Sequence, residues 1–365
     1  MMSSSENLLP GDVSALVPLP PTTVPHGVIS GACLFEQPAS KNSGNIINKI
    51  FFIMQIRYKN TNIVANMNKK RYFCMNYIRK LNMLRIAVQS KGRLFDDTMN
   101  LLKEADIRVT ASKRILLVQA NNFPLEVLYL RDDDIPESVA DGVADIGIVG
   151  ENEFVERKER AQIISRLGFS KCRLSLAIPK EVHYTGLQWF DGRRIATSYP
   201  NILRSFLKKN NISADIHVIT GSVEISPGIG LTDAIFDIVS SGSTLMSNNL
   251  KEVEVVMKSE AVLIGNRNMD EEKHKILDEM LFRFAAVRSA QGKKYVMMNC
   301  PKEKVGAITK VLPGIKSPTI IPLADEGWCS IHTVLDEERF WEIIGKLKEL
   351  GAQGILVTPI EKMIL

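Results

Sequence analysis

Apolar and polar residues alternate regularly from Leu84 to the end of the chain. Short apolar runs of strand length are followed by segments whose apolar residues recur every three or four positions, as on one face of a helix. The run Leu84–Val88 predicts a first strand, and Phe95, Met99 and Leu102 predict a helix at 95–105. This alternation is typical of α/β proteins. Further strands are predicted at 115–119, 126–130, 145–149, 163–167, 174–178, 194–197, 216–219, 235–239, 253–257 and 261–265, and helices from Pro136, at 202–209 and at 271–290.

A turn-rich segment at 179–192 divides these elements into two groups, and we interpret it as the crossing into a second lobe. The strand at 261–265 then returns the chain to the first lobe. The sequence therefore predicts a first lobe made of residues 84–180 plus 262–290. The second lobe is predicted to comprise residues 181–261.

The segment 291–365 has the pattern of a separate small domain. Strands are predicted at 295–299, 319–323, 330–335 and 355–358, and helices at 302–312 and 337–350. The order βαββαβ is that of a ferredoxin-like domain, with both helices on one face of an antiparallel sheet. By analogy of fold alone, such a domain binds a regulatory ligand or a partner.

The charge of the chain changes this picture at its N-terminus only. The chain has 365 residues and a formal net charge of +5, but residues 1–83 alone carry nine basic and three acidic residues. The body, 84–365, is therefore −1, which argues against a nucleic-acid partner. Residues 1–83 show no sustained period and lack the order of a signal peptide. We interpret them either as a leader upstream of a natural start at Met83 or as a disordered basic tail.

Cysteine usage and hydropathy indicate a cytoplasmic protein without a membrane segment. The five cysteines are scattered without a CxxC pair, which predicts isolated buried thiols and neither a disulfide framework nor a zinc site. The apolar runs fall short of the ~20 residues that cross a bilayer.

The segment 221–250 is the most informative about chemistry. Asp237 is predicted to open an apolar strand that ends in the Ser/Gly/Thr turn 240–244, with a helix starting near Leu245. A glycine, exposed N–H groups and hydroxyls at such a turn suit a phosphate, and acids such as Asp233 and Asp237 suit ribose hydroxyls or Mg²⁺ held through water. Alternatively, the turn only caps a helix and Asp233 is a solvated turn residue.

Several ordered motifs extend this signal over the whole body. The chain resembles the long form of ATP phosphoribosyltransferase, the first enzyme of histidine biosynthesis. The motifs are LRIAVQSKGRL (84–94), RDDDIP (131–136), DGVADIGIVGEN (141–152), GSVEISPGIGLTDAIFDIVSSGSTL (221–245), LPGIKSPTIIPLADEGW (312–328) and LGAQGILVTPIEKM (350–363).

The resemblance implies a two-lobed, periplasmic-binding-protein-like α/β core with a C-terminal regulatory domain. It implies transfer of 5-phosphoribosyl from PRPP to N1 of ATP and a requirement for Mg²⁺, which is held mainly through the substrates. It also implies feedback inhibition by histidine and homo-oligomers that are dimers or hexamers. We expect no single indispensable nucleophile.

The resemblance also assigns roles to residues of this chain. Ser241, Gly242, Ser243 and Thr244 are expected to bind the 5-phosphate of PRPP, and Asp233, Asp237 and Glu224 to face its ribose. Lys91, Arg93, Asp145, Glu151 and Asn152 are expected at the ATP side, with a strand-edge cap as the alternative for Asp145. Asn299, Thr319 and Gly354 are expected to line the histidine pocket, although Asn299 can also be read as the cap of a helix starting at Pro301.

Two other classes of function compete with this interpretation. A two-lobed solute-binding protein would use the same lobes, but an exported binder should carry a signal peptide or a lipidation site, and neither is visible. A nucleic-acid-binding regulator would need a helix-turn-helix or a basic face, which a body of net charge −1 does not offer.

Overall fold

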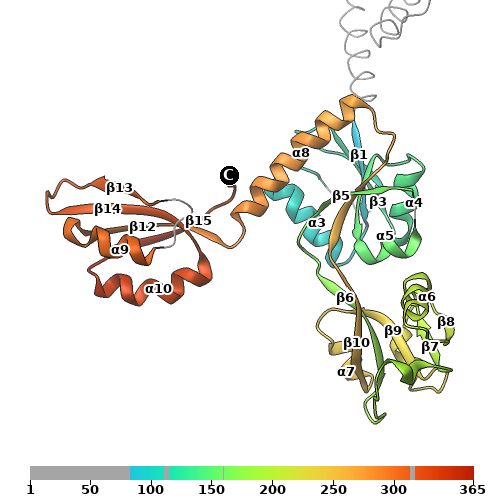
Figure 1. Cartoon of the computed structure of the whole chain (residues 1–365). Coiled ribbons are helices and arrows are strands. Elements are labelled where there is room, and N and C mark those ends of the chain that lie inside the picture. Colours follow the sequence, from blue (N-terminus) through green and yellow to red (C-terminus); the bar gives the residue numbers. More distant parts are fainter. Residues whose placement is uncertain (1–82, 111–114, 159, 313–316) are drawn as a thin grey trace, which may run out of the picture. The chain divides into compact units, whose positions relative to one another are not determined.

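The computed structural model describes residues 83–365 with gaps at 111–114, 159 and 313–316. The expectations about the N-terminal extension therefore lie almost entirely outside the described residues. The described chain forms three sheets, each with its own helices, in the α/β arrangement that the sequence predicted (Figure 1).

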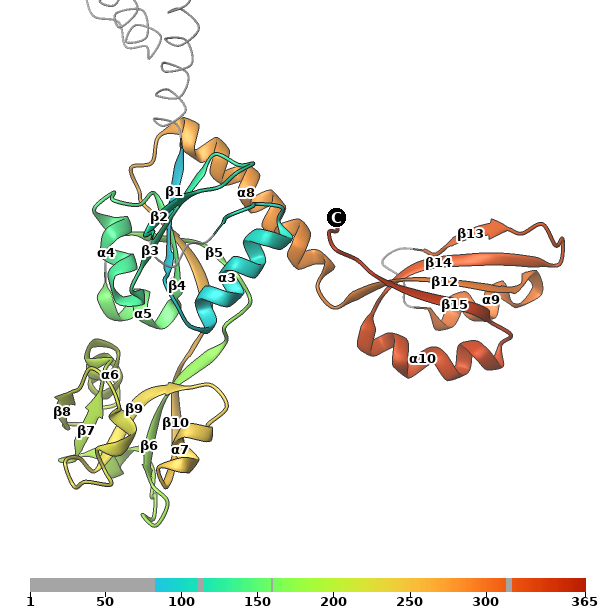
Figure 2. The same ribbon diagram turned by 180° about the vertical axis from the view of Figure 1, so that it is seen from behind.

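The first sheet has six strands in the order β2-β3-β1-β4-β11-β5, with β3, β1 and β4 parallel. Its central strands are predominantly apolar because both faces are covered. Helices α3 and α8 pack on one face and α4 and α5 on the other (Figure 2). The elements are β1 (Leu84–Gln89), α3 (Arg93–Glu104), β2 (Leu117–Gln119), β3 (Leu125–Leu130), α4 (Ile135–Ala140), β4 (Ile146–Gly150), α5 (Glu151–Arg157), β5 (Gln162–Arg166), β11 (Ala261–Gly265) and α8 (Glu271–Ala290).

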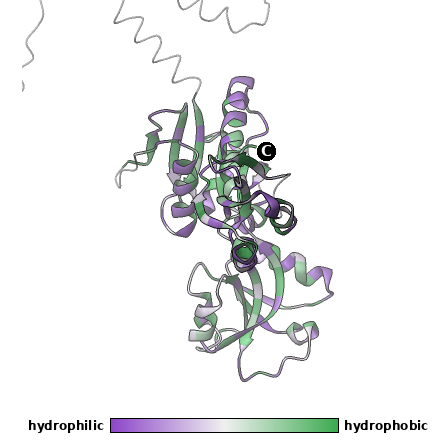
Figure 3. Cartoon of the chain, turned by 90° about the vertical axis from the view of Figure 1, so that its left-hand side faces the viewer, coloured by the Kyte–Doolittle hydropathy of each residue, from purple (hydrophilic) through white to green (hydrophobic). Residues whose placement is uncertain are grey.

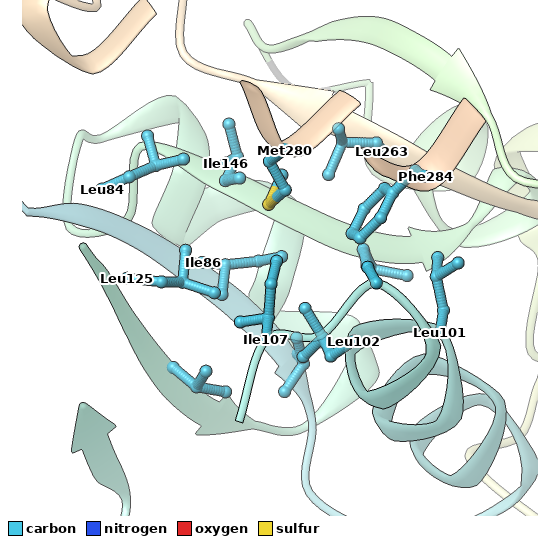
Figure 4. Packing of buried hydrophobic residues seen from close by; sticks show 14 of the residues in the cluster. Leu84, Ile86, Leu101, Leu102, Ile107, Leu125, Ile146, Leu263, Met280 and Phe284 are labelled. Carbon is cyan, nitrogen blue, oxygen red and sulfur yellow. The ribbon is translucent and has the colours of Figure 1, made fainter. Parts of the chain in front are cut away.

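The main core of this sheet joins α3 and α8 to the strands. Leu101 and Leu102 of α3 meet Met280 and Phe284 of α8 over Ile86 of β1 (Figure 4). The hydropathy colouring shows the strands as predominantly apolar and the helices as mixed (Figure 3). Burial of such side chains stabilises the fold by ~25 cal/mol per Å² of apolar area.

The second sheet has five strands in the order β10-β6-β9-β7-β8, of which β9, β7 and β8 are parallel. Helix α6 covers one face through Ile202, Leu203 and Leu207, while Leu245 of α7 packs on the other. The elements are β6 (Cys172–Pro179), β7 (Arg194–Thr197), α6 (Pro200–Lys209), β8 (Asp215–Val218), the short 3₁₀ turn η3 (Val223–Ile225), β9 (Ala234–Val239), α7 (Ser243–Ser247) and β10 (Leu250–Ser259).

One strand lies in a different sheet from the one predicted. The sequence analysis placed 174–178 in the first lobe, but β6 pairs antiparallel with β9 and β10 of the second sheet. The chain therefore changes sheets between β5 and β6, and the turn-rich segment 179–192 lies within the second lobe. An apolar strand fits either sheet equally well, so its pattern could not decide between them.

The third sheet has the order β13-β14-β12-β15 and is antiparallel. Helices α9 and α10 both pack on one face, which confirms the ferredoxin-like layout. The elements are β12 (Lys293–Pro301), α9 (Val305–Val311), β13 (Thr319–Pro322), β14 (Trp328–Asp336), α10 (Glu337–Glu349) and β15 (Gln353–Pro359).

Candidate functional site

The turn after β9 combines a constrained glycine with exposed hydroxyls. Gly242 has φ 82°, a conformation that a side chain rarely adopts, and it directly precedes α7. The Oγ atoms of Ser241 and Ser243 lie 3.0 Å apart, and both residues are exposed, as is Thr244. The turn therefore presents hydroxyls and backbone N–H groups to solvent, which is the equipment that an anionic ligand requires.

Asp237 and Glu224 form a pair of carboxylates beside this turn. The sequence analysis predicted that Asp237 opens a strand. Asp237 instead lies within β9, because the apolar run already begins at Ala234. Burial, reinforced by the nearby Glu224 carboxylate, raises the pKa of Asp237 to about 6, against the opposing hydrogen bonds from Ile238 N–H and Ser198. Among the described residues neither carboxylate has an ion-pair partner. The pair is thus an uncompensated negative region that suits hydroxyl donors or a cation.

Residues from both lobes meet next to this pair. Tyr199, which follows β7, donates its hydroxyl to Glu153 of α5, and Asn152 Nδ2 donates to the same hydroxyl at 3.1 Å. Burial raises the pKa of both Tyr199 and Glu153. Sequence reasoning missed Tyr199 and Glu153, although Tyr199 in SYP directly follows a predicted strand.

Asp233 lies at the other end of β9 and its carboxylate is occupied. It accepts the backbone N–H of Arg194 at 2.9 Å and a guanidinium N–H of Arg194 at 3.0 Å. This contact holds the pKa of Asp233 below its usual range. Asp233 and Asp237 are four residues apart on one strand, which is ~13 Å. Asp233 is therefore engaged by Arg194 within the second lobe and lies apart from Asp237, whereas the sequence analysis expected both to face one ribose.

Asp145 repeats this arrangement in the first sheet. Its carboxylate accepts the backbone N–H of Arg85 at 2.8 Å and the Nζ of Lys273 at 2.7 Å. It stands before β4, at the amino end of the parallel strands, whereas Lys91 follows the carboxyl end of β1. The Asp145 carboxylate is therefore engaged as a strand-edge cap would be, and its expected place at the ATP side stays a prediction.

The remaining residues predicted for ATP lie at the carboxyl edge of the first sheet. Lys91 and Arg93 are exposed beside the start of α3, and the Arg93 guanidinium lies 3.8 Å from the Asp97 carboxylate. Glu151 starts α5 and is held by Arg166, with Nη2 and Oε1 2.5 Å apart. Asn152 is buried and also hydrogen-bonds Ser259. Lys91 and Arg93 are thus available to a ligand, whereas Glu151 and Asn152 are engaged within the protein.

Asn299 and Gly354, two of the residues predicted for the regulatory ligand, lie side by side. A Cβ on Gly354, whose φ is 55°, would stand 3.6 Å from Asn299 Nδ2. Asn299 does not cap the next helical turn, which lacks a side-chain cap. Strand pairing puts Thr319 opposite His332 and Asn299 opposite Ser330, all on the face away from the helices. Thr319 is therefore two strands away from Asn299.

His332, which sequence reasoning missed, links this polar row. Its Nδ1 lies 2.8 Å from the Tyr295 hydroxyl, and its Nε2 lies 3.0 Å from Ser330 Oγ. Ser330 and His332 are two residues apart on one strand and so share a face, but only β-sheet register brings Tyr295 of β12 beside them.

The cysteines differ in part from the expectation. Cys300 and Cys329 are buried, as predicted, but they are not isolated, since they oppose each other on β12 and β14 with Sγ atoms 3.6 Å apart. Over residues 83–365 and outside the gaps, no cluster of three or more His, Cys, Asp or Glu residues could hold a metal ion. No helix in the same residues is long and apolar enough to cross a membrane.

Comparisons with known proteins agree over most of the described chain. A family model described as ATP phosphoribosyltransferase matches residues 131–286, and one described as the C-terminal domain of HisG matches residues 290–362. A protein named ATP phosphoribosyltransferase from Phocaeicola vulgatus is 75% identical over 283 residues, covering 78% of this chain and 100% of the relative. A protein of the same name from Bacteroides thetaiotaomicron is 73% identical over 283 residues, again covering 78% of this chain and 100% of the relative.

Solved structures align over about half of the chain. A complex titled ATP phosphoribosyl transferase (HisG:HisZ) from Thermotoga maritima gives a TM-score of 0.48 at 27% identity, covering 55% of this chain and 98% of that chain. The substrate-binding protein of an amino acid ABC transporter gives a TM-score of 0.39 at 11% identity, covering 57% of this chain and 93% of that chain.

Proposed function

The chain belongs to the ATP phosphoribosyltransferase family, and we propose that it transfers the 5-phosphoribosyl group of PRPP to N1 of ATP, releasing pyrophosphate, as the first step of histidine biosynthesis. The observation that carries the proposal is the Glu224–Asp237 carboxylate pair next to the hydroxyl-rich turn 240–244. A ribose 5-phosphate needs both parts, one for its hydroxyls and one for its phosphate.

Each lobe supplies one side of the reaction. Ser241, Gly242, Ser243 and Thr244 bind the 5-phosphate of PRPP, and Asp237 and Glu224 accept from the ribose hydroxyls. On the first lobe, Lys91 and Arg93 are the exposed cations that meet the phosphates of ATP. Asn152 and Glu151 support this edge through their contacts with Tyr199, Ser259 and Arg166.

The reaction forms one bond and breaks one. The lone pair of adenine N1 attacks C1 of the ribose, while the C1–O bond to pyrophosphate breaks and its electrons leave with the pyrophosphate. The transition state is oxocarbenium-like, as in other glycosyl transfers. The ionised Asp237 and Glu224 stabilise positive charge on the ribose, and alignment of two bound substrates supplies the rest of the acceleration. No side chain needs to become covalently attached.

Mg²⁺ fits this site as a companion of the substrates. The described residues contain no three-residue metal cluster, but Asp237 and Glu224 can hold a hydrated ion. The ion would neutralise the phosphate oxygens of the leaving group.

The C-terminal domain is proposed to bind histidine as a feedback inhibitor on the sheet face opposite its helices. Asn299 and Gly354 form the floor of this site, with Thr319 and His332 further along the same face. The family resemblance also leads us to propose dimeric and hexameric assemblies.

Pyrophosphate release from PRPP, ATP and Mg²⁺ tests the proposal. Purified 1–365 and 83–365 are compared with and without histidine, using a coupled assay for pyrophosphate. We expect release that requires both substrates and falls with histidine. An Asn299→Ala variant should keep the rate and lose much of the inhibition. Binding of ATP without any pyrophosphate release would favour a solute-binding protein instead.

A further inference from the structure

Glu156 of α5 is a buried carboxylate that belongs to the first lobe but bonds to the second. It is 5% exposed, and its two oxygens accept the backbone N–H groups of Asn201 at 2.8 Å and Ile202 at 2.9 Å. The side chain of Asn201 returns a hydrogen bond to the Glu156 carbonyl at 3.1 Å. Burying a carboxylate is costly unless it is fully hydrogen-bonded, so this contact is a specific one.

The contact supplies what α6 lacks at its N-terminus. The first N–H groups of a helix have no partner within the helix, and a residue such as Ser or Asp usually accepts from them. The N-cap of α6 is Tyr199, which makes no side-chain cap, and Pro200 has no N–H to satisfy. Glu156 therefore caps α6 from a different lobe, and its negative charge also meets the positive end of the helix dipole.

The same side of α5 makes the neighbouring contacts between the lobes. Asn152 lies one helical turn before Glu156, and it bonds both Tyr199 and Ser259. Helix α5 directly follows β4 of the first sheet, and α6 directly follows β7 of the second. Any shift of α6 relative to α5 therefore moves Ser198 and Tyr199, which contact Asp237 and Glu153.

We propose that Glu156 is a positioning residue that fixes the alignment of the two lobes, and through α6 the alignment of the two substrates. This inference rests on the proposed function. Glu156 itself touches neither substrate, so its loss should leave each substrate bound to its own lobe. The alignment of N1 with C1 should suffer, because small misplacements cost rate steeply.

The test compares Glu156→Gln and Glu156→Ala with the wild type and with Asp270→Ala. Asp270 is a matched control because its Oδ1 caps α8 at Lys273 N–H, 2.9 Å away, inside the first lobe. We expect kcat per folded protein to fall about tenfold or more in Glu156→Ala and less in Glu156→Gln, with KM for PRPP nearly unchanged. Asp270→Ala should lower Tm without changing kcat.

Hydrogen exchange measured by mass spectrometry on peptides spanning 199–206 gives a readout independent of activity. The Asn201 and Ile202 amides should exchange faster in Glu156→Ala and stay protected in Asp270→Ala. Unchanged protection in Glu156→Ala would overturn the cap. Faster exchange with an unchanged kcat would overturn the positioning role. A wild-type protein that releases no pyrophosphate would count against the proposed function, and the exchange experiment would then decide the cap by itself.

Discussion

Carboxylates lie at both ends of the parallel strands, but two at the amino ends are paired with cations, whereas two near the carboxyl end of β9 are not paired in the described part of the chain. At the amino edges, Asp145 and Asp233 each precede a strand and accept the backbone N–H of the residue beside them, Arg85 and Arg194 respectively. A basic side chain completes each contact, Lys273 in one lobe and Arg194 in the other. At the carboxyl edge, Asp237 and Glu224 have no cation beside them among the described residues, and the turn 240–244 is open to solvent.

The difference separates stability from chemistry. A carboxylate with an arginine or lysine and an N–H donor is electrostatically satisfied, so it holds neighbouring strands together and has little left to offer a ligand. A carboxylate pushed towards protonation by burial and a like charge weakens the fold and is poised to meet a ligand. The same duplicated geometry at both amino edges indicates that these aspartates serve the sheets, while function lies at the opposite edges.

Removing the charge of Asp237 should have the largest effect on activity. Asp237→Asn keeps the shape but no longer stabilises positive charge on the ribose, and we expect kcat to fall about 100-fold. Because ionised Asp237 is required, the wild-type rate should fall as pH is lowered through about 6. Pyrophosphate release, followed between acid and neutral pH, measures both the kcat of Asp237→Asn and the pH dependence of the wild-type rate. A variant with a wild-type rate would remove Asp237 from the mechanism.

Gly242→Ala should impair the use of PRPP next most strongly. The φ of 82° makes any side chain costly there, and a shift of the turn would displace its N–H groups from the phosphate. Gly192→Ala is the control, since Gly192 has φ 70°, open space around it and a position outside this turn. We expect a higher KM for PRPP only in Gly242→Ala, with histidine inhibition retained in both. Equal KM values in the two variants would contradict the assignment of the turn. Thr244→Val should act in the same direction.

Asp145→Asn should lower stability with little effect on catalysis. The variant weakens the contacts to Lys273 and to Arg85 N–H, which is worth about 1–2 kcal/mol. Urea unfolding measures the loss, and the kcat of the folded variant is its control. A loss of ATP use at unchanged stability would instead indicate that Asp145 contacts ATP.

Lys91→Ala should have the smallest effect. Lys91 is exposed and makes no ion pair with the rest of the described chain, so Tm should not change. KM for ATP should rise a few-fold because an exposed cation contributes about 1 kcal/mol to a phosphate contact. Lys103→Ala, on the exposed side of α3, serves as the charge-matched control. An unchanged KM for ATP in Lys91→Ala would exclude that contact.

The sequence predicted most elements, because apolar spacing and turn residues are local signals. It could not assign β6 to a sheet, since pairing partners are a tertiary property. It could not separate Asp233 from Asp237 either. The partner of Asp233 is 39 residues away and that of Asp145 is 128 residues away, and only the folded sheets bring them together. Residue chemistry alone indicated the turn 240–244, and the family motifs added Asn299, but Tyr199 and Glu156 emerged only from contacts between the lobes.

The most direct test compares thermal unfolding and pyrophosphate release in Asp237→Asn and Asp233→Asn. The raised pKa of Asp237 means that its stabilising contribution is present below the ordinary pKa of an aspartate and is lost as pH rises through about 6. At neutral pH, Asp237→Asn should therefore gain up to ~3 kcal/mol of stability while losing activity. The lowered pKa of Asp233 has the opposite sign, so Asp233→Asn should lose stability and keep its activity. Loss of activity in both variants, or a less stable Asp237→Asn, would contradict the division between the two edges.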